Sequence, residues 1–181
     1  EELQALVAET HARGRRVHIH AHAQPGLTHA MDAGCDVILH GAMIDAQALE
    51  QLAAQRDELW YMPTLYITSK PVWSHPSRPA HMRERMQQAH PVHRAGVRRA
   101  NELGIRIAVG TDGGPGSVMH ELCELVACGL TPMQAIVAAT QTTADCLGIL
   151  EQTGTLAPGK RADVLVVRGD PLARIELLTE P

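Results

Sequence analysis

The first part of the chain alternates between helical and strand-like patterns of apolar residues. Residues 1–13 place apolar side chains at helical spacing, and residues 17–22 then alternate apolar and polar side chains as a strand does. Residues 25–33 predict a short helix that ends at a glycine, and residues 36–41 predict a compact apolar strand. This part of the chain therefore predicts helix, strand, helix and strand in succession.

The same alternation continues in the next part of the chain. Residues 45–56 predict a helix, 58–67 a strand, 80–103 a long arginine-rich helix and 105–109 another apolar strand. Between them, residues 68–79 are rich in proline and serine and predict a long loop of the kind that often covers a substrate. Alternating helices and apolar strands favour right-handed βαβ units, so the predicted class is α/β with a parallel sheet.

The pattern changes near residue 150. Two more helices are predicted at 117–128 and 132–147. Residues 153–168 are rich in turn residues and end in a β-branched strand, with no helix between. We therefore divide the chain into residues 1–150, an α/β domain, and residues 151–181, part of a small β domain.

Composition and charge restrict the possible partners. The 181 residues are 45% hydrophobic and 20% charged, as in a soluble globular domain, and the formal charge is −4. Without a basic surface or a long apolar stretch, we expect neither a nucleic-acid nor a membrane partner. The four cysteines lack zinc-ribbon spacing and are expected to be buried thiols. The sequence leaves the localisation open, with a slight preference for the cytoplasm.

Polar side chains follow the predicted strands at their carboxyl ends. They are His20 or His22, then His40, then the region of Tyr66, and finally Asp112. In a parallel α/β barrel these strand ends meet at one face, where active sites form. Histidine and aspartate suit zinc or a similar divalent ion with an open position for water. Taken singly, a strand histidine is more often a hydrogen-bonded core residue, and Asp112 could cap a helix.

Five segments occur in the order found in the amidohydrolase superfamily, which the chain therefore resembles. They are Val17–His22, Asp36–Gly41, Val109–Gly114, Gly129–Thr140 and Gly154–Leu172. The last of them is the most specific. The chain is similar in particular to the imidazolonepropionase-like branch, which includes dipeptidases acting on Xaa-Pro peptides. The resemblance covers essentially the whole chain.

The resemblance implies a fold and a set of roles. The fold would be the C-terminal half of a (β/α)8 TIM-type barrel, strands five to eight, followed by strands of a small β-sandwich domain. His20, His40 and Asp112 would bind one or two Zn²⁺ or similar divalent ions. Asp112 and His40 would be the catalytic residues. Asp112 would take the proton from the attacking water and pass it to the leaving amine. His22 and Tyr66 would contact the substrate.

The same resemblance implies ligands that this chain lacks. A His-x-His pair usually ends the first strand, and a carboxylated lysine often ends the fourth. His20 and His22 could form such a pair, but the residues after them match the passage from the fifth to the sixth strand. Neither Lys70 nor Lys160 ends a predicted strand. The chain is therefore expected to be a fragment that needs the N-terminal half of the barrel or a second copy, and a homo-oligomer is possible.

Three functions remain open from the sequence. The leading one is a metal-dependent hydrolase that cleaves C–N amide bonds in small molecules or dipeptides with metal-activated water, here as a fragment that would be inactive alone. The second is a non-catalytic half-barrel that assembles with itself or with a partner chain. The third keeps the fold but is a deaminase or a cyclic-amide hydrolase.

Overall fold

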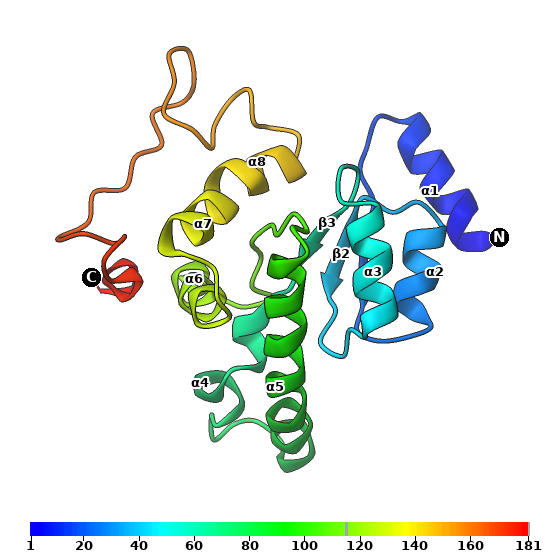
Figure 1. The fold of residues 1–181 in the computed structure, drawn as a ribbon, viewed down its shortest axis with the longest axis horizontal. Coiled ribbons are helices and arrows are strands. Elements are labelled where there is room, and N and C mark those ends of the chain that lie inside the picture. The colour runs from blue at the N-terminus through cyan, green and yellow to red at the C-terminus, as the bar shows by residue number, and fades with distance from the viewer. Residues whose placement is uncertain (115, 181) are drawn as a thin grey trace.

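A computed structural model describes residues 1–114 and 116–180 of the chain (Figure 1). Its first part contains α1 (Glu2–Ala12), β1 (His18–Ala21), α2 (Gly26–Asp32), β2 (Val37–His40), α3 (Ala46–Ala54) and β3 (Trp60–Met62). Then follow a 3-10 helix η1 (Leu65–Thr68), α4 (Lys70–Trp73), α5 (Ala80–Glu102), α6 (Ser117–Ala127), α7 (Pro132–Val137), a π-helical turn η2 (Ala138–Thr142), α8 (Thr143–Cys146) and a 3-10 helix η3 (Ile175–Thr179).

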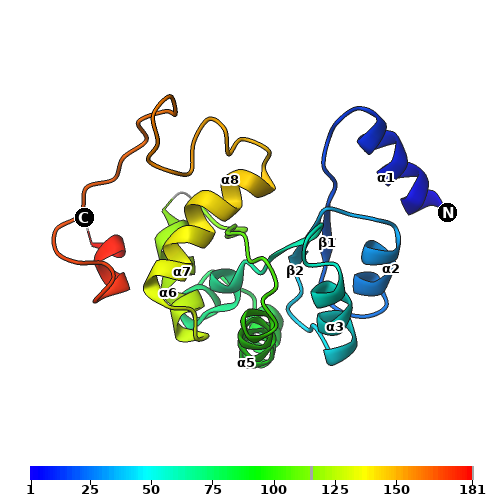
Figure 2. The ribbon, with the colours of Figure 1, turned by 45° about the horizontal axis from the view of Figure 1, so that its top comes forward.

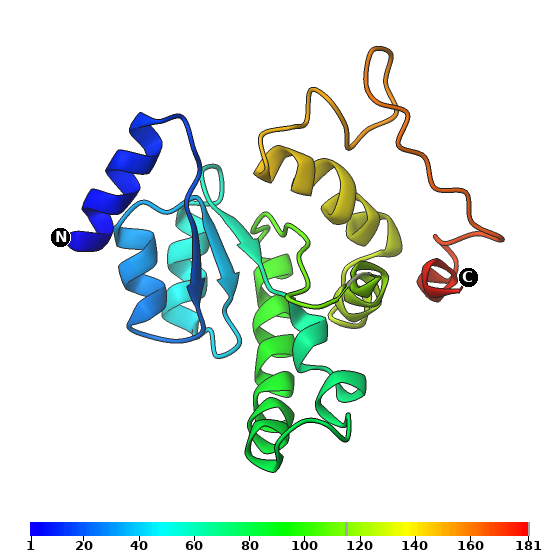
Figure 3. The ribbon, with the colours of Figure 1, turned by 180° about the vertical axis from the view of Figure 1, so that it is seen from behind.

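The three strands form a parallel sheet in the order β1-β2-β3, which confirms the predicted α/β class. Their carboxyl ends therefore lie at one edge. Helices α2 and α3 cover one side of the sheet, and α6, α7 and α8 lie beyond α5 on the other side of the molecule (Figures 1 and 3). The site described below lies at the carboxyl edge of this sheet.

The two faces of the sheet are buried to different extents. Ile38 and Tyr61 face the helices and belong to the main hydrophobic core. On the opposite face, Val37, Trp60 and Met62 form a smaller buried cluster with Ala108 and Cys146. Strand alternation separates the two sets, because successive side chains point to opposite faces. His18 and His20 share the second face and are exposed there.

Two predicted strands are shorter in the structure than in the sequence analysis. The strand expected over 58–67 ends at Met62, because Pro63 has no N–H to donate and Thr64 adopts a left-handed φ of 52°. The run 105–109 lies beside β3 through hydrogen bonds from Tyr61 N to Arg106 O and from Ala108 N to Tyr61 O, both 2.9 Å. Only one isolated bridge, Tyr61 to Ile107, is formed there.

The strand expected at the end of 153–168 is not formed. Within the described residues no strand lies beside this segment, and Leu165 and Val166 remain 63% and 88% exposed. A strand needs a partner for its backbone groups, so the segment runs as an irregular, looped tail (Figure 2). The prediction of a plain loop over 68–79 is also wrong, since α4 lies within it.

The predicted helix 132–147 is continuous but contains the π turn η2. Thr131 begins it with a capping box to Gln134. Directly after the turn, Thr143 Oγ1 donates to Ala138 O at 2.6 Å and accepts from Val109 N at 2.8 Å. The π turn thus joins the helix to the extended run that precedes Asp112.

In the part of the chain described here, no helix is long and apolar enough to cross a membrane.

Candidate active site

Three histidine rings meet at the carboxyl edge of the sheet. His20 lies in β1, His22 follows the end of β1, and His40 is the last residue of β2. The ring centroids are 4.4 Å apart for His20 and His40, 4.7 Å for His20 and His22, and 4.9 Å for His22 and His40. We call these residues the three-histidine cluster. The structure therefore brings together three of the residues singled out from the sequence.

The backbone at His40 explains how its ring reaches this cluster. Register pairs His40 with Ala21, so simple alternation would point its side chain toward the helices, away from His20. Instead His40 adopts a left-handed φ of 73°, which breaks the alternation at the end of β2. Its carbonyl oxygen accepts hydrogen bonds from Tyr61 Oη and His93 Nε2, both at 2.9 Å. These two buried donors hold the unusual conformation.

The strand ends share this left-handed conformation. His40, Thr64 and Asp112 have φ values of 73°, 52° and 49°, and each follows or ends a strand or extended run of the sheet. Such residues cost about 1–3 kcal/mol each and tend to gather at functional sites. Thr64 Oγ1 lies 2.7 Å from His40 Nδ1, so the turn after β3 contacts the ring that ends β2.

Burial and neighbouring charges favour the neutral forms of His22 and His40. Burial, together with the charges of His20 and His22, lowers the pKa of His40 to about 4, although the Asp112 carboxylate opposes the shift. Burial and the charge of His20 also lower the pKa of His22, again against Asp112, and Arg85 adds to the lowering. Asp112 itself is exposed, but its carboxylate is close enough to act on both rings. A neutral imidazole is the form that binds metal ions.

The donors present fit part of a metal site. Imidazole nitrogens and a carboxylate are suitable ligands for zinc and similar ions. However, within residues 1–114 and 116–180 no group of three or more His, Cys, Asp or Glu side chains is arranged so that it could hold a metal ion. The rings touch, but the described residues do not form a complete ligand set.

Tyr66 lies in a different setting from the one expected. The strand predicted over 58–67 includes Tyr66, but in the structure Tyr66 belongs to η1. Its ring stacks on His120, with centroids 4.9 Å apart and an angle of 15° between the planes. The prediction that Tyr66 lies in a strand is therefore wrong.

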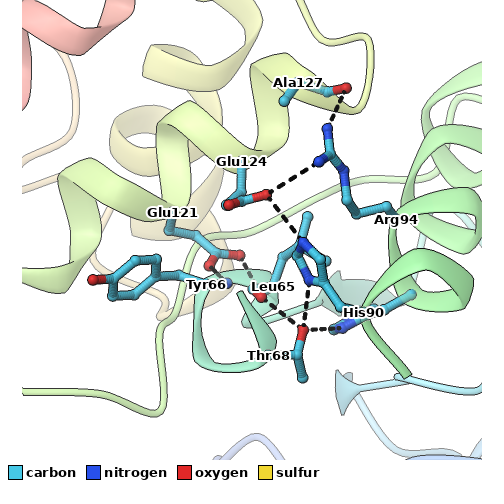
Figure 4. Close-up of polar contacts among 9 residues, drawn as sticks. Leu65, Tyr66, Thr68, His90, Arg94, Glu121, Glu124 and Ala127 are labelled. Atoms are coloured by element: carbon cyan, nitrogen blue, oxygen red, sulfur yellow. Dashed lines mark hydrogen bonds and ion pairs between the residues drawn. The ribbon is translucent and has the colours of Figure 1, made fainter. Parts of the chain in front are cut away.

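A buried polar network that the sequence did not predict lies beside the site (Figure 4). Glu121, in α6, accepts hydrogen bonds from the backbone N–H groups of Leu65 and Tyr66, and Thr68 lies 3.1 Å from His90 Nδ1. A signal was present, because Glu121 lies on the apolar stripe that α6 forms with Leu122 and Leu125. A polar residue within such a stripe needs a partner in the fold.

His93 is a second buried polar residue that the sequence did not predict to support the site. It lies on the buried face of α5 with Gly96, Val97 and Ala100. Burial lowers its pKa to about 3, although the hydrogen bond to the His40 carbonyl opposes the shift. His93 is therefore a neutral donor that supports the backbone of the candidate site.

A family model now decides the assignment, because the amidohydrolase family model matches residues 1–181. The chain belongs to the amidohydrolase family. Among curated relatives, ochratoxinase of Aspergillus niger is 28% identical over the whole of this chain, which spans 38% of that protein. Imidazolonepropionase of Deinococcus radiodurans is 30% identical over 93% of this chain and 39% of that protein.

Solved structures of the family share the fold of this chain. A Xaa-Pro dipeptidase with bound methionine in its active site superposes with a TM-score of 0.87 and 31% identity, over 99% of this chain and 45% of the dipeptidase. The ochratoxinase structure gives a TM-score of 0.85, over 99% of this chain and 41% of that enzyme. The amidohydrolase chain described here thus spans less than half the length of these relatives.

Proposed function

We propose that this amidohydrolase chain supplies part of the active site of a metal-dependent hydrolase that cleaves C–N amide bonds in small molecules or dipeptides. The observation that supports this is the contact between the rings of His20 and His40, 4.4 Å apart at the carboxyl edge of the sheet. Asp112 acts electrostatically on the same cluster. A core role alone does not explain His20, because its side chain is exposed.

In this proposal His20, His40 and Asp112 would hold the metal, zinc or a similar divalent ion, one or two in number. A divalent ion there would acidify water and polarise the scissile carbonyl. Asp112 would take a proton from the attacking water and return it to the leaving amine, which suits an exposed carboxylate at the open edge. His22 would contact the substrate from the same cluster, and Tyr66 would line the approach beside His120.

The remaining ligands would come from outside this chain. We propose that residues 1–150 form the C-terminal half of a (β/α)8 barrel and that residues 151–181 form part of a β-sandwich domain. The small share of the relatives' length that the chain covers, 38% to 45%, supports this division. The exposed apolar residues of the 153–168 tail, such as Val166 at 88%, would then be covered by further strands. The rest of the barrel, or a second copy, would complete it.

The substrate class follows from the relatives and is tested by assay. The similarity to the Xaa-Pro dipeptidase supports dipeptides as substrates, and the similarity to imidazolonepropionase supports cyclic amides. The protein that carries this chain should be assayed with zinc on Xaa-Pro dipeptides, N-acyl amino acids and a cyclic amide. Hydrolysis should be lost in Asp112→Asn and kept in Asp57→Asn, a control at an exposed carboxylate before β3, at the opposite edge of the sheet. Equal activity in both variants would contradict the proposed role of Asp112.

A further inference from the structure

We propose that Glu121 is a positioning residue, which fixes the turn at Thr64 and through Thr64 orients the ring of His40. The inference rests on the proposed function for its purpose, since His40 is there a metal ligand. Its structural steps do not depend on the metal. They join α6, the turn after β3 and the end of β2 in one chain of contacts.

The first step is the pair of hydrogen bonds between Glu121 and the turn. Glu121 is fully buried, and its Oε1 and Oε2 accept hydrogen bonds from Leu65 N at 2.7 Å and Tyr66 N at 2.6 Å. These N–H groups lie at the start of η1, where a helix has no internal acceptors for them. Figure 4 shows both contacts, and a buried side chain that binds both N–H groups sets where η1 begins.

The second step runs from the turn to His40. Thr64 precedes η1 and takes a left-handed φ of 52°, a conformation that threonine adopts only when its surroundings enforce it. Its Oγ1 lies 2.7 Å from His40 Nδ1. If Nδ1–H donates to this oxygen, the lone pair of His40 Nε2 stays free for a metal. Metal-binding histidines are generally fixed in this way through their second nitrogen.

The backbone of His40 is held independently of Glu121. Tyr61 Oη and His93 Nε2 both donate to the His40 carbonyl at 2.9 Å. Loss of the Glu121 contacts should therefore leave the end of β2 in place and release mainly the ring. This separation makes a positioning role distinguishable from a general role in the core.

The test compares Glu121→Gln with Glu124→Gln. Above about pH 8, where Glu121 is ionised, the glutamate accepts both N–H groups, whereas glutamine can accept only one of them and turns its amide donors toward the other. Glu124 lies one helical turn further along α6 and pairs with His90 and Arg94 instead of the amides of Leu65 and Tyr66, so it is a matched control. Two readouts need no metal: hydrogen exchange at the amides of Leu65 and Tyr66, and the ring ¹⁵N chemical shifts of His40. A third is Zn²⁺ affinity by calorimetry.

In Glu121→Gln we expect faster exchange at both amides, altered ring shifts of His40 and a Zn²⁺ affinity lower by about 10–100-fold. Faster exchange with His40 ring shifts identical to the wild type would overturn the inference, because Glu121 would then support only the turn. If the His40 ring shifts change in Glu121→Gln but the wild-type protein does not bind Zn²⁺, the inference stands and the proposed function is contradicted instead.

A second variant covers the case in which Glu121→Gln fails to fold. Thr64→Val keeps the shape of the side chain and every Glu121 contact but removes the hydroxyl. It should alter the His40 ring shifts while the amides of Leu65 and Tyr66 keep their wild-type exchange. Unchanged ring shifts in Thr64→Val would overturn the proposed link on their own.

Discussion

Replacing Tyr61 with phenylalanine isolates one of the two hydrogen bonds that hold the end of β2. The Tyr61 side chain is fully buried, and its hydroxyl donates to the His40 carbonyl at 2.9 Å. Phenylalanine keeps the ring in the core and leaves the carbonyl with its second donor, His93. Because the carbonyl stays bonded, only the net value of one buried hydrogen bond is lost, about 1 kcal/mol.

Urea denaturation followed by circular dichroism measures this loss. The urea concentration at the midpoint of unfolding should fall, and the slope of the unfolding free energy against urea concentration should not change. In a thermal scan, the melting temperature should fall by about 2–4 °C for a domain of this size. Burial raises the pKa of Tyr61, so the hydroxyl stays protonated and the loss should not vary across the neutral range. Tyr66→Phe, at a half-exposed ring that stacks on His120, serves as a control with little expected change. A Tyr61→Phe variant as stable as the wild type would refute the argument that this bond supports His40.

Three further predictions concern stability. Gly96→Ala should destabilise the chain although alanine favours helices, because its Cβ would lie 2.4 Å from Ile44 Cγ2; thermal melting checks the sign, and a gain in stability would contradict the packing. Burial raises the pKa of Glu121 to about 8 from an ordinary 4.5, so its protonated form is favoured by folding. The free energy of unfolding should therefore be greatest below about pH 4.5 and fall as the pH rises to about 8. This fall should be steeper in the wild type than in Glu121→Gln, and urea titrations of both proteins across this pH range measure it. The same dependence on pH in both proteins would count against the prediction. Thr131→Ala removes the capping box with Gln134 and should cost about 1 kcal/mol, and an unchanged urea midpoint would show that the cap adds nothing.

The sequence predicts the order of elements well where apolar periodicity is strong. The strands at β1 and β2, the long helix α5 and the helices that begin near 117 and 132 occur as expected, because apolar residues recur at strand or helical spacing in each. That His20, His22 and His40 lie at one edge was also predictable, since carboxyl ends of parallel strands meet there, but the left-handed φ that turns the His40 ring toward His20 was not.

Other features depend on contacts that periodicity cannot show. The end of β3 is set by Pro63 and by the left-handed Thr64, and the run 58–67 alone reads as one strand. The tail at 153–168 has strand-like residues, yet a strand forms only where another strand lies beside it. The role of Glu121 was not predicted, because its partners, Leu65 and Tyr66, lie far away in the sequence.

Zinc binding by the protein that carries this chain tests the central claim most directly. Zinc content after equilibrium dialysis should be compared among the wild type, His40→Ala, Asp112→Ala and the control His75→Ala, at an exposed histidine that contacts Ser77. The account predicts saturable binding of about one zinc per chain in the wild type and the control, and its loss in the other two variants. A folded wild type that binds no zinc, or equal binding in all four proteins, would contradict a metal site built on His40 and Asp112.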